Sequence, residues 1–415
     1  MPTGDLREVS VFDPDVYANG DPGQNGLPIE LFARLRNGAP CVRLPCDIPG
    51  HEKSAWVLSR YEDVSTMLRE PDHFLSGSGV TMRATHTTVS EDGGKPAMIT
   101  MDGAAHVRNR RLVNRGFTPA VVRRFEAHFR MIAGDIVQRA VDLGAFDFVG
   151  EVASQFPLHA ICDLLGVPEA DRPALARWTN TLTTPTDPEY APTPGEFFAA
   201  MEHMWAYGLE LAQLRRRSPG TDVMSVIVAA ADNDALSEDE LMGFVFTLAA
   251  AGNETTRNSA SHALLALLQR PEQLAWLRAR AERIPDSAIE ELLRWSTPVI
   301  YIRRTAACDL EMAGQGIAAG DPVAGFVASA NFDATEFPHP LELDLVRRPN
   351  RHLTFATGPH LCMGAHIARL ELRVLFEELL TRTRSIELEG PMEYARDSYV
   401  RGVKRLGVRV TQRRP

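Results

Sequence analysis

Hydrophobic and polar positions follow helical spacing through most of the middle of the chain. From about Ala104 to Gln269 the apolar residues recur at the spacing of one face of an α-helix. Proline and glycine interrupt this pattern in "TTPTDPEYAPTPGE" (183–196) and in "RSPGTD" (217–222). The first interruption is long and has an exposed character, so we expect it to form a mobile lid between two helices.

A single long helix is predicted to begin at Ser237. Ser237 and Glu240 form a capping-box pattern, acidic residues fill the first turn, and Pro271 lies just past the expected end. The middle of this helix is apolar nearly all round, which predicts that it crosses the interior of the protein. A second capped helix is expected over Ser287 to Trp295, ending before Pro298 because the residue ahead of a proline disfavours helical geometry.

Strand-like segments follow these helices. "VIYIRRTA" (299–306) and "PVAGFVA" (322–328) are rich in β-branched and aromatic residues, and "GQGIAAGD" (314–321) supplies turn residues between them. The sequence therefore predicts a mainly α fold with small β-sheets. We expect residues 1–415 to form a single domain, since no repeat, low-complexity tract or linker interrupts the chain.

Composition limits the classes of partner. The chain carries a net charge of −10, which argues against nucleic acid and anionic membranes as main partners. It has no apolar signal region and no apolar run long enough to span a bilayer, so we expect a soluble cytoplasmic protein without a membrane partner. The five cysteines do not resemble a disulfide framework, and only Cys41 and Cys46 lie close in sequence.

One of these cysteines, Cys362, lies where a glycine-broken loop turns into an amphipathic helix, in "FATGPHLCMGAHIAR" (355–369). Three interpretations compete. A zinc site would use His360 and His366, but it needs four ligands and no second pair is present. A buried apolar cysteine is common, yet it does not explain the bracketing glycines. A thiolate ligand of haem iron fits a helix N-terminus, where unpaired amides stabilise the anion.

The loop resembles the haem-binding signature of the cytochrome P450 superfamily, phenylalanine-x-x-glycine-x-histidine-x-cysteine-x-glycine. The matching residues are Phe355, Gly358, His360, Cys362 and Gly364. Ala356 departs from the family's pattern, which commonly has glycine at this position. Because alanine is also small, the departure affects only the expected geometry of the turn. Other segments resemble the same family from roughly residue 101 to the C-terminus. The resemblance implies the P450 fold, with haem buried between the long helix and the cysteine loop.

The segment "AGNETT" (251–256), in the middle of the long helix, has a plain interpretation in which small residues ease helix packing and Thr255 is a satisfied core hydroxyl. Against it, a buried acid beside an alcohol is costly unless it is used. Gly252 and Thr255 can also loosen the helix locally. The stretch resembles the family's oxygen-activation groove, which implies that Glu254 and Thr255 are a catalytic acid–alcohol pair that delivers protons. The N-glycosylation sequon formed by residues 253–255 is then a false positive.

A second resemblance concerns an ion pair. Glu291 and Arg294 in "EELLR" could be a surface pair, worth a few tenths of a kcal/mol on a helix. The family instead uses such a pair as a buried structural anchor joined by a later arginine, and Arg347 fits that position best. The segment 330–355 resembles the irregular meander that precedes the haem loop in these proteins.

Basic residues in "HVRNRR" (106–111) could form a solvated surface. The resemblance implies instead that His106 and Arg110 face the haem propionates. Arg304 matches another propionate-binding arginine, with Arg303 as its competitor, and His360 fits as a fourth contact. Two carboxylates placed in a desolvated site need such cationic and hydrogen-bonding groups.

The resemblance implies a haem b monooxygenase that inserts one atom of O₂ into an apolar small molecule, by hydroxylation or epoxidation. Terpenoids, steroids and similar lipids are the substrate classes it suggests. No flavin or nicotinamide fingerprint is present, so electrons are expected from a separate ferredoxin and ferredoxin reductase. Arg108, Arg111 and Arg115 could dock an acidic ferredoxin. The pocket-lining residues expected by analogy are Leu248, Ala251, Val299, Ile300, Tyr399 and Val400.

Two alternative functions remain at this point. A peroxide-driven haem-thiolate enzyme would usually lack the acid–alcohol pair, whereas Glu254 and Thr255 are both present. A non-enzymatic haem sensor would need neither a proton relay nor a docking surface for a redox partner.

Overall fold

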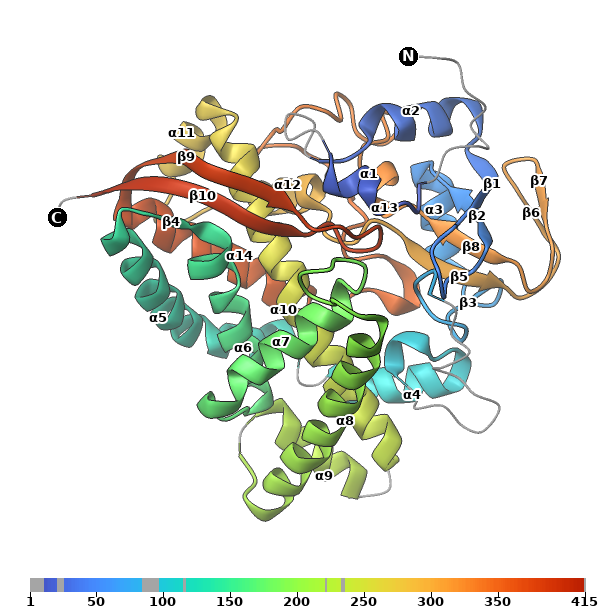
Figure 1. The fold of residues 1–415 in the computed structure, drawn as a ribbon, viewed down its shortest axis with the longest axis horizontal. Coiled ribbons are helices and arrows are strands. Elements are labelled where there is room, and N and C mark those ends of the chain that lie inside the picture. Colours follow the sequence, from blue (N-terminus) through green and yellow to red (C-terminus); the bar gives the residue numbers. More distant parts are fainter. Residues whose placement is uncertain are drawn as a thin grey trace.

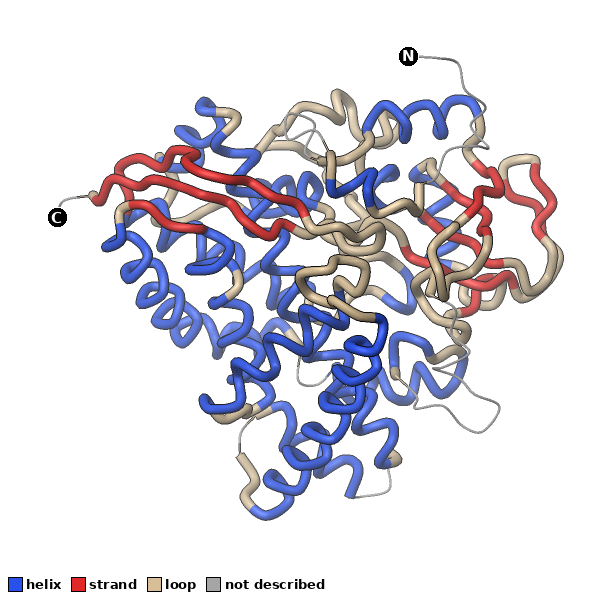
Figure 2. The backbone as a smooth tube through the Cα atoms, viewed as in Figure 1, coloured by secondary structure: helices blue, strands red, loops and turns tan. Residues whose placement is uncertain are grey.

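Strands gather in two separate groups at opposite ends of the molecule, and helices fill the space between and below them (Figure 1, Figure 2). The computed structural model describes residues 11–20, 26–83, 97–114, 117–220, 222–232 and 236–413. The longer helices are α2 (Ile29–Gly38), α3 (Tyr61–Arg69), α4 (Gly103–Asn114), α5 (Pro119–Leu143), α6 (Gln155–Leu165), α7 (Arg172–Thr183), α8 (Pro194–Arg217), α9 (Val223–Asp232), α10 (Glu238–Leu268), α12 (Asp286–Ser296) and α14 (Ala365–Arg382). Short helices are α1 (Asp15–Ala18), α11 (Pro271–Arg278) and α13 (Val327–Ala330). The predicted mainly α class is confirmed.

The sheets are small. The largest has the strand order β1 (Cys41–Pro45), β2 (Ser54–Leu58), β8 (Pro322–Gly325), β5 (Ile302–Ala306) and β3 (Phe74–Leu75), and only its β2–β8 pairing is parallel. A three-stranded antiparallel sheet has the order β4 (Ala145–Asp147), β10 (Val403–Gln412) and β9 (Thr383–Tyr394). The hairpin of β6 (Leu310–Met312) and β7 (Gln315–Ile317) stands apart from both.

The predicted strands are partly correct. In the first stretch, regular pairing begins only at Ile302, because Ile300 donates its N–H to the carbonyl of Tyr399 at 2.8 Å instead of to a neighbouring strand. In the second stretch the strand ends at Gly325 and helix α13 follows. The segment 314–321 supplies turns at Gly314 and at residues 319–320, as expected, and strand β7 lies between them.

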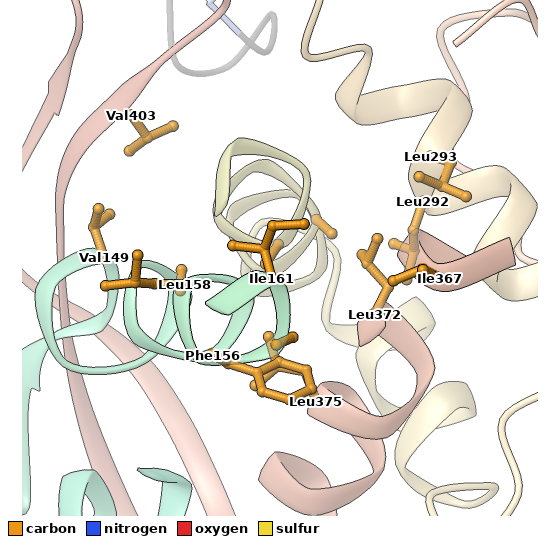
Figure 3. Close-up of a cluster of buried hydrophobic side chains, with 14 of the residues drawn as sticks. Val149, Phe156, Leu158, Ile161, Leu292, Leu293, Ile367, Leu372, Leu375 and Val403 are labelled. Carbon is orange, nitrogen blue, oxygen red and sulfur yellow. The ribbon is translucent and has the colours of Figure 1, made fainter. Parts of the chain in front are cut away.

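Helix α10 runs through the centre of the helical part, as its apolar middle predicted (Figure 1). Ser237 caps it in a complete capping box, with the N–H of Glu240 donating to Ser237 Oγ at 3.1 Å. Figure 3 shows Ile161 of α6 pointing toward this helix. A Cβ on Gly252 would lie 3.2 Å from Cδ1 of Ile161, so the glycine lets α6 pack closely. The helix is continuous here, which supports packing as the role of Gly252 and not a break.

Helix α12 forms where predicted but begins differently. It spans Asp286–Ser296, and Ser287 does not cap it, because the N-cap position is Pro285 and no side chain accepts a hydrogen bond there. The acidic Asp286 in the first turn instead complements the positive end of the helix dipole. The helix ends at Ser296, and its C-cap residue Thr297 has a φ of 35°, in the left-handed region ahead of Pro298.

The segment between α7 and α8, expected to be an exposed lid, is anchored. Thr184 and Asp187 are buried, so the exposed character inferred from the sequence is wrong at these positions. Thr186 Oγ1 donates to Asp397 Oδ2 at 2.7 Å, and the N–H of Arg396 donates to Asp187 Oδ2 at 2.8 Å. The segment is therefore fastened to the turn between β9 and β10.

Two remaining sequence expectations concern cysteines and membranes. Cys41 and Cys46 both carry free, buried thiols, so there is no bridge between them. Burial raises the pKa of Cys41 to about 12, so that this thiol stays protonated. Within the described ranges, no helix has both the length and the apolar character needed to cross a membrane.

Candidate active site

The cysteine loop has a tight backbone that only certain residues permit. Gly358 has a φ of +71°, and a Cβ there would lie 2.4 Å from the carbonyl oxygen of Leu68. Ala356, where the family commonly has glycine, also lies in the left-handed region with a φ of 56°. The turn geometry is therefore kept, and the alanine accepts a conformation that costs an L-residue about 1–2 kcal/mol.

The loop places Cys362 just before α14, which begins at Ala365. The N–H of Cys362 donates to the carbonyl of Phe355 at 2.9 Å, closing the loop. Burial raises the pKa of the Cys362 thiol, while the N–H of Gly364 and the charge of Arg110 are among the groups that lower it. The cysteine nevertheless keeps accessible surface, unlike the buried Cys162. An accessible sulfur at a helix N-terminus is suited to ligate a metal.

The neighbouring histidines do not complete a metal site with Cys362. His360 Nε2 lies 3.1 Å from Ser76 Oγ, and its ring stacks on His106 with centroids 4.0 Å apart. Among the residues that the structure describes, no group of three or more His, Cys, Asp or Glu side chains is arranged to hold a metal ion. The zinc interpretation gains no support from this geometry.

The four groups proposed from the sequence to contact propionates lie close together. Burial is the main reason why the pKa of His360 falls to about 3. The neighbouring basic side chains lower it further, and they are Arg304, His106 and Arg110. His106 Nε2 is buried without a hydrogen-bond partner among the described residues. Nor does any of the four form an ion pair within the described ranges. Two arginines and two histidines, of which His106 and Arg304 are buried, supply charged and neutral donors that suit the two carboxylates of a porphyrin.

Two adjacent arginines on β5 differ in their surroundings because successive side chains of a strand point to opposite faces. Arg303 pairs with Glu52 at 3.1 Å and donates to the carbonyls of Ser78 and Gly79. Nη1 of Arg304 donates to the carbonyl of Arg303 at 2.9 Å. Burial lowers the pKa of Arg304 to about 10. The geometry favours Arg304 over Arg303 as the arginine free to bind a ligand.

The acid and the alcohol of α10 do not contact each other. Thr255 Oγ1 donates to the carbonyl of Ala251 at 2.8 Å, the back-bonding expected of threonine in a helix. Glu254 is fully buried and accepts from Arg257 and, at 2.9 Å, from Asn258. Burial raises the pKa of Glu254, and Arg257 opposes this shift. The second carboxyl oxygen, Oε2, has no partner among the described residues.

A further buried acid, Glu371 on α14, was missed in the sequence analysis. Burial raises its pKa to about 8, although a hydrogen bond with Thr256 opposes the shift. Thr256 adjoins Thr255, so an acid that keeps its proton near neutral pH lies beside the central helix. Its signal in the sequence was position: Glu371 falls four residues after Ile367 and three before Val374, on the apolar stripe of α14.

The predicted ion-pair anchor is confirmed. Arg294 Nη2 lies 2.8 Å from Glu291 Oε1, and Arg347 Nε lies 3.1 Å from Glu291 Oε2, with all three side chains buried. Glu291 Oε1 also accepts from the N–H of Asp344 at 3.0 Å. Hydrogen bonds from Arg294 and the charges of Arg294 and Arg347 outweigh burial and lower the pKa of Glu291. The anchor joins α12 to the meander that leads into the cysteine loop.

The predicted docking arginines on α4 have different environments. Arg110 donates to the carbonyl of Leu361, so α4 lies directly against the cysteine loop. Arg108 pairs with Glu240, which reduces its value as a docking cation. Arg111 is exposed, and Arg115 lies outside the described residues.

The expected pocket-lining residues divide between two regions. Val299 and Val400 form an isolated β-bridge, which brings the end of α12 next to the C-terminal turn. Ile300, between Val299 and Tyr301, is completely buried. Ala251 on α10 is exposed, and Leu248 one turn earlier is buried.

Comparison with known proteins identifies the class. The family model described as cytochrome P450 matches residues 199–391. The chain is 36% identical over 391 residues to a steroid C26-monooxygenase of Mycolicibacterium smegmatis, covering 91% of this chain and 89% of the relative. It is 37% identical over 416 residues to a methyl-branched lipid omega-hydroxylase of Mycobacterium tuberculosis, covering 97% and 95%. A solved Mycobacterium marinum cytochrome P450 in complex with pseudoionone superposes with a TM-score of 0.88 at 34% identity, covering 98% of this chain and 99% of that one.

The fold and the cysteine loop therefore define a haem-thiolate protein, and the chain belongs to the cytochrome P450 family. Within that family it is a monooxygenase, in agreement with the sequence analysis.

Proposed function

We propose that this enzyme binds haem b through Cys362 and hydroxylates or epoxidises a steroid, terpenoid or related lipid. The observation that carries the proposal is the accessible thiol just before α14, beside a partly buried cluster of arginine and histidine side chains that form no ion pair in the described part of the chain. His106, Arg110, Arg304 and His360 would hold the propionates. Residues 1–415 would act as one domain.

When bound, the haem would activate O₂ for transfer of one oxygen atom to the substrate. The protein would supply a thiolate, an apolar pocket and a proton supply. Thr255 would position a proton at its hydroxyl, which now bonds back to Ala251. Glu254 would exchange protons through Oε2, the oxygen without a partner among the described residues.

The substrate class rests on the relatives. One is named for oxidation of a steroid and another for omega-hydroxylation of a methyl-branched lipid. The residues Ala251, Val299 and Val400 are apolar, which agrees with a lipid substrate.

The test is the optical spectrum of the dithionite-reduced protein under carbon monoxide. A Soret band shifted far to the red is expected, because thiolate ligation alters the electronic structure of the iron. The Cys362→Ser variant should lose that band, and Cys162→Ser, which changes a buried thiol elsewhere, should retain it. An ordinary haem–CO band in the unchanged protein would contradict thiolate ligation.

The basic cluster has a separate test. Arg304→Gln should release haem faster to apomyoglobin, because a buried carboxylate would lose its charged partner. Arg303→Gln is the matched control on the same strand, and it should leave the release rate close to that of the unchanged protein. Equal rates for both variants and the unchanged protein would contradict the assignment.

Electrons would come from a separate ferredoxin. We propose that Arg111 is part of the docking surface, since it is exposed on α4, the helix that contacts the cysteine loop through Arg110. Arg111→Glu should slow reduction by a surrogate ferredoxin and leave substrate binding intact. Arg139→Glu, an exposed position on α5, is the control.

Product formation with a ferredoxin system would also exclude a haem sensor, and dependence on O₂ in place of peroxide would exclude a peroxygenase. The cytoplasmic location stays a prediction.

A further inference from the structure

A half-buried arginine, Arg83, lies at the end of the described segment 26–83. Its guanidinium carbon lies 4.0 Å from the centroid of the Phe197 ring, near the beginning of α8. Burial lowers the pKa of Arg83, and the nearby Asp397 and Tyr301 raise it. Within the described ranges, the guanidinium forms no hydrogen bond and no ion pair. Its five N–H donors therefore have no acceptor among the described residues.

The nearby acid does not satisfy this cation. Asp397 Oδ1 accepts from the N–H of Tyr399 at 2.7 Å and from that of Val400 at 2.9 Å. Its other oxygen accepts from Thr186 Oγ1 at 2.7 Å. The carboxylate is thus used to shape the C-terminal turn and to hold the segment between α7 and α8. It influences Arg83 at a distance without pairing with it.

The position of Arg83 relative to the active site follows from a chain of contacts. The N–H of Met82 donates to the hydroxyl of Tyr301 at 3.1 Å, and the Tyr301 ring packs edge-on against Tyr399 with centroids 5.4 Å apart. Burial raises the pKa of Tyr399 to about 12, and Arg304 lies close enough for its charge to oppose this shift. Arg83 is therefore linked to Arg304 through the neighbouring side chains of Tyr301 and Tyr399. Arg304 is buried and Arg83 is half-buried, so Arg83 is the one nearer solvent.

We propose that Arg83 binds the carboxylate of an elongated apolar substrate, an inference that rests on the proposed function. The guanidinium would hold the carboxylate through two parallel hydrogen bonds, a geometry that arginine provides and lysine does not. The ring of Phe197 would pack against the first methylene groups. The substrate would then be an amphipathic lipid acid, with its apolar body directed to α10. Since the chain carries a net charge of −10, an anionic substrate needs such a cation at its binding site.

The experiment compares an acid with its uncharged ester. Hexadecanoic acid and methyl hexadecanoate are titrated into the ferric holoenzyme by isothermal calorimetry, with the spin-state change of the haem as a second readout. The unchanged protein should bind the acid more tightly than the ester. Arg83→Gln should weaken the affinity for the acid by about 10- to 100-fold, as expected for loss of a charge-assisted hydrogen-bonded pair. The affinity for the ester should stay within about twofold of that of the unchanged protein. Arg83→Lys should recover part of the preference for the acid over the ester, because lysine keeps the charge.

Arg43→Gln is the matched control, because Arg43 on β1 pairs with Asp321 at 3.4 Å on the sheet. It should leave both affinities unchanged. Three results would overturn the proposal: equal binding of acid and ester by the unchanged protein, equal weakening of both by Arg83→Gln, or no binding of the acid at all. The carbon monoxide spectrum separates these failures from failure of the proposed function, since it does not depend on Arg83. The comparison within the unchanged protein holds even if a variant does not fold.

Discussion

The buried acid Glu371 makes a specific prediction about stability and pH. Its carboxyl is buried on α14, and burial raises its pKa from an ordinary value of 4.5 to about 8 in the folded protein. In the unfolded chain the group is hydrated and ionises near the ordinary value. Between these two values the folded protein keeps a proton that the unfolded chain releases. The free energy of unfolding must therefore fall as the pH rises across this window.

The magnitude follows from the two pKa values. Each pH unit inside the window changes the free energy of unfolding by about 1.4 kcal/mol for one proton. From pH 4.5 to pH 7 the contribution of Glu371 therefore reaches about 3 kcal/mol of lost stability, and it stops growing above the folded-state pKa of about 8. Glu371→Gln removes the titrating group and keeps the shape and the hydrogen-bonding capacity. From pH 5 to pH 8, the stability of this variant relative to the unchanged protein should rise by about 3.5 kcal/mol.

The assay is urea unfolding of both proteins at several values between pH 5 and pH 8. Glu290→Gln provides the control. Burial would raise the pKa of Glu290, but hydrogen bonds from Arg369 and His352 outweigh burial and lower it to about 2. Glu290 is thus ionised in both states throughout that range, and its substitution should cost a nearly constant amount. A stability difference for Glu371→Gln that stays flat with pH would refute the reasoning.

Two structural predictions concern the cysteine loop and its anchor. Gly358→Ala should lower the free energy of unfolding by about 2–4 kcal/mol, from a left-handed φ and a contact with the Leu68 carbonyl. Ala356→Gly, two residues away, should stay within about 1 kcal/mol, because relief of the φ strain is offset by backbone entropy and a lost methyl group. Urea denaturation of both checks this, and comparable effects at the two positions would contradict it. Glu291→Ala should cost about 3–5 kcal/mol by leaving Arg294 and Arg347 buried without their anion. Thermal and urea unfolding measure this loss, and a change under about 1 kcal/mol would show that the triad is dispensable.

Local patterns predicted the elements whose causes are local. The capping box at Ser237 formed as expected, because the two residues that make it lie within one turn. Strand boundaries were less predictable. Ile300 has the composition of a strand residue, but its N–H bonds to Tyr399, which lies far away in sequence. Only the folded arrangement of the C-terminal turn decides that partner.

The exposure of the segment between α7 and α8 shows the same limit. Its prolines and polar residues predicted a surface lid. Asp187 is nevertheless buried, because Arg396 and Lys404 from the far end of the chain surround it with donors. A polar residue can be buried when its own hydrogen-bonding atoms have partners, and those partners cannot be identified from the local sequence.

The resemblance to the family implies that Glu254 and Thr255 carry chemistry, which stays a prediction. Helix geometry explains why their side chains bond to different partners. Adjacent residues on a helix point about 100° apart, so Glu254 and Thr255 face different neighbours. Glu254 meets Arg257 and Asn258, three and four residues later, while Thr255 bonds back to Ala251, four residues earlier. This periodicity was already present in the sequence. Glu254 and Thr255 are therefore adjacent along the chain but bond to different partners, so we expect that a proton passing between their side chains would need an intermediate carrier.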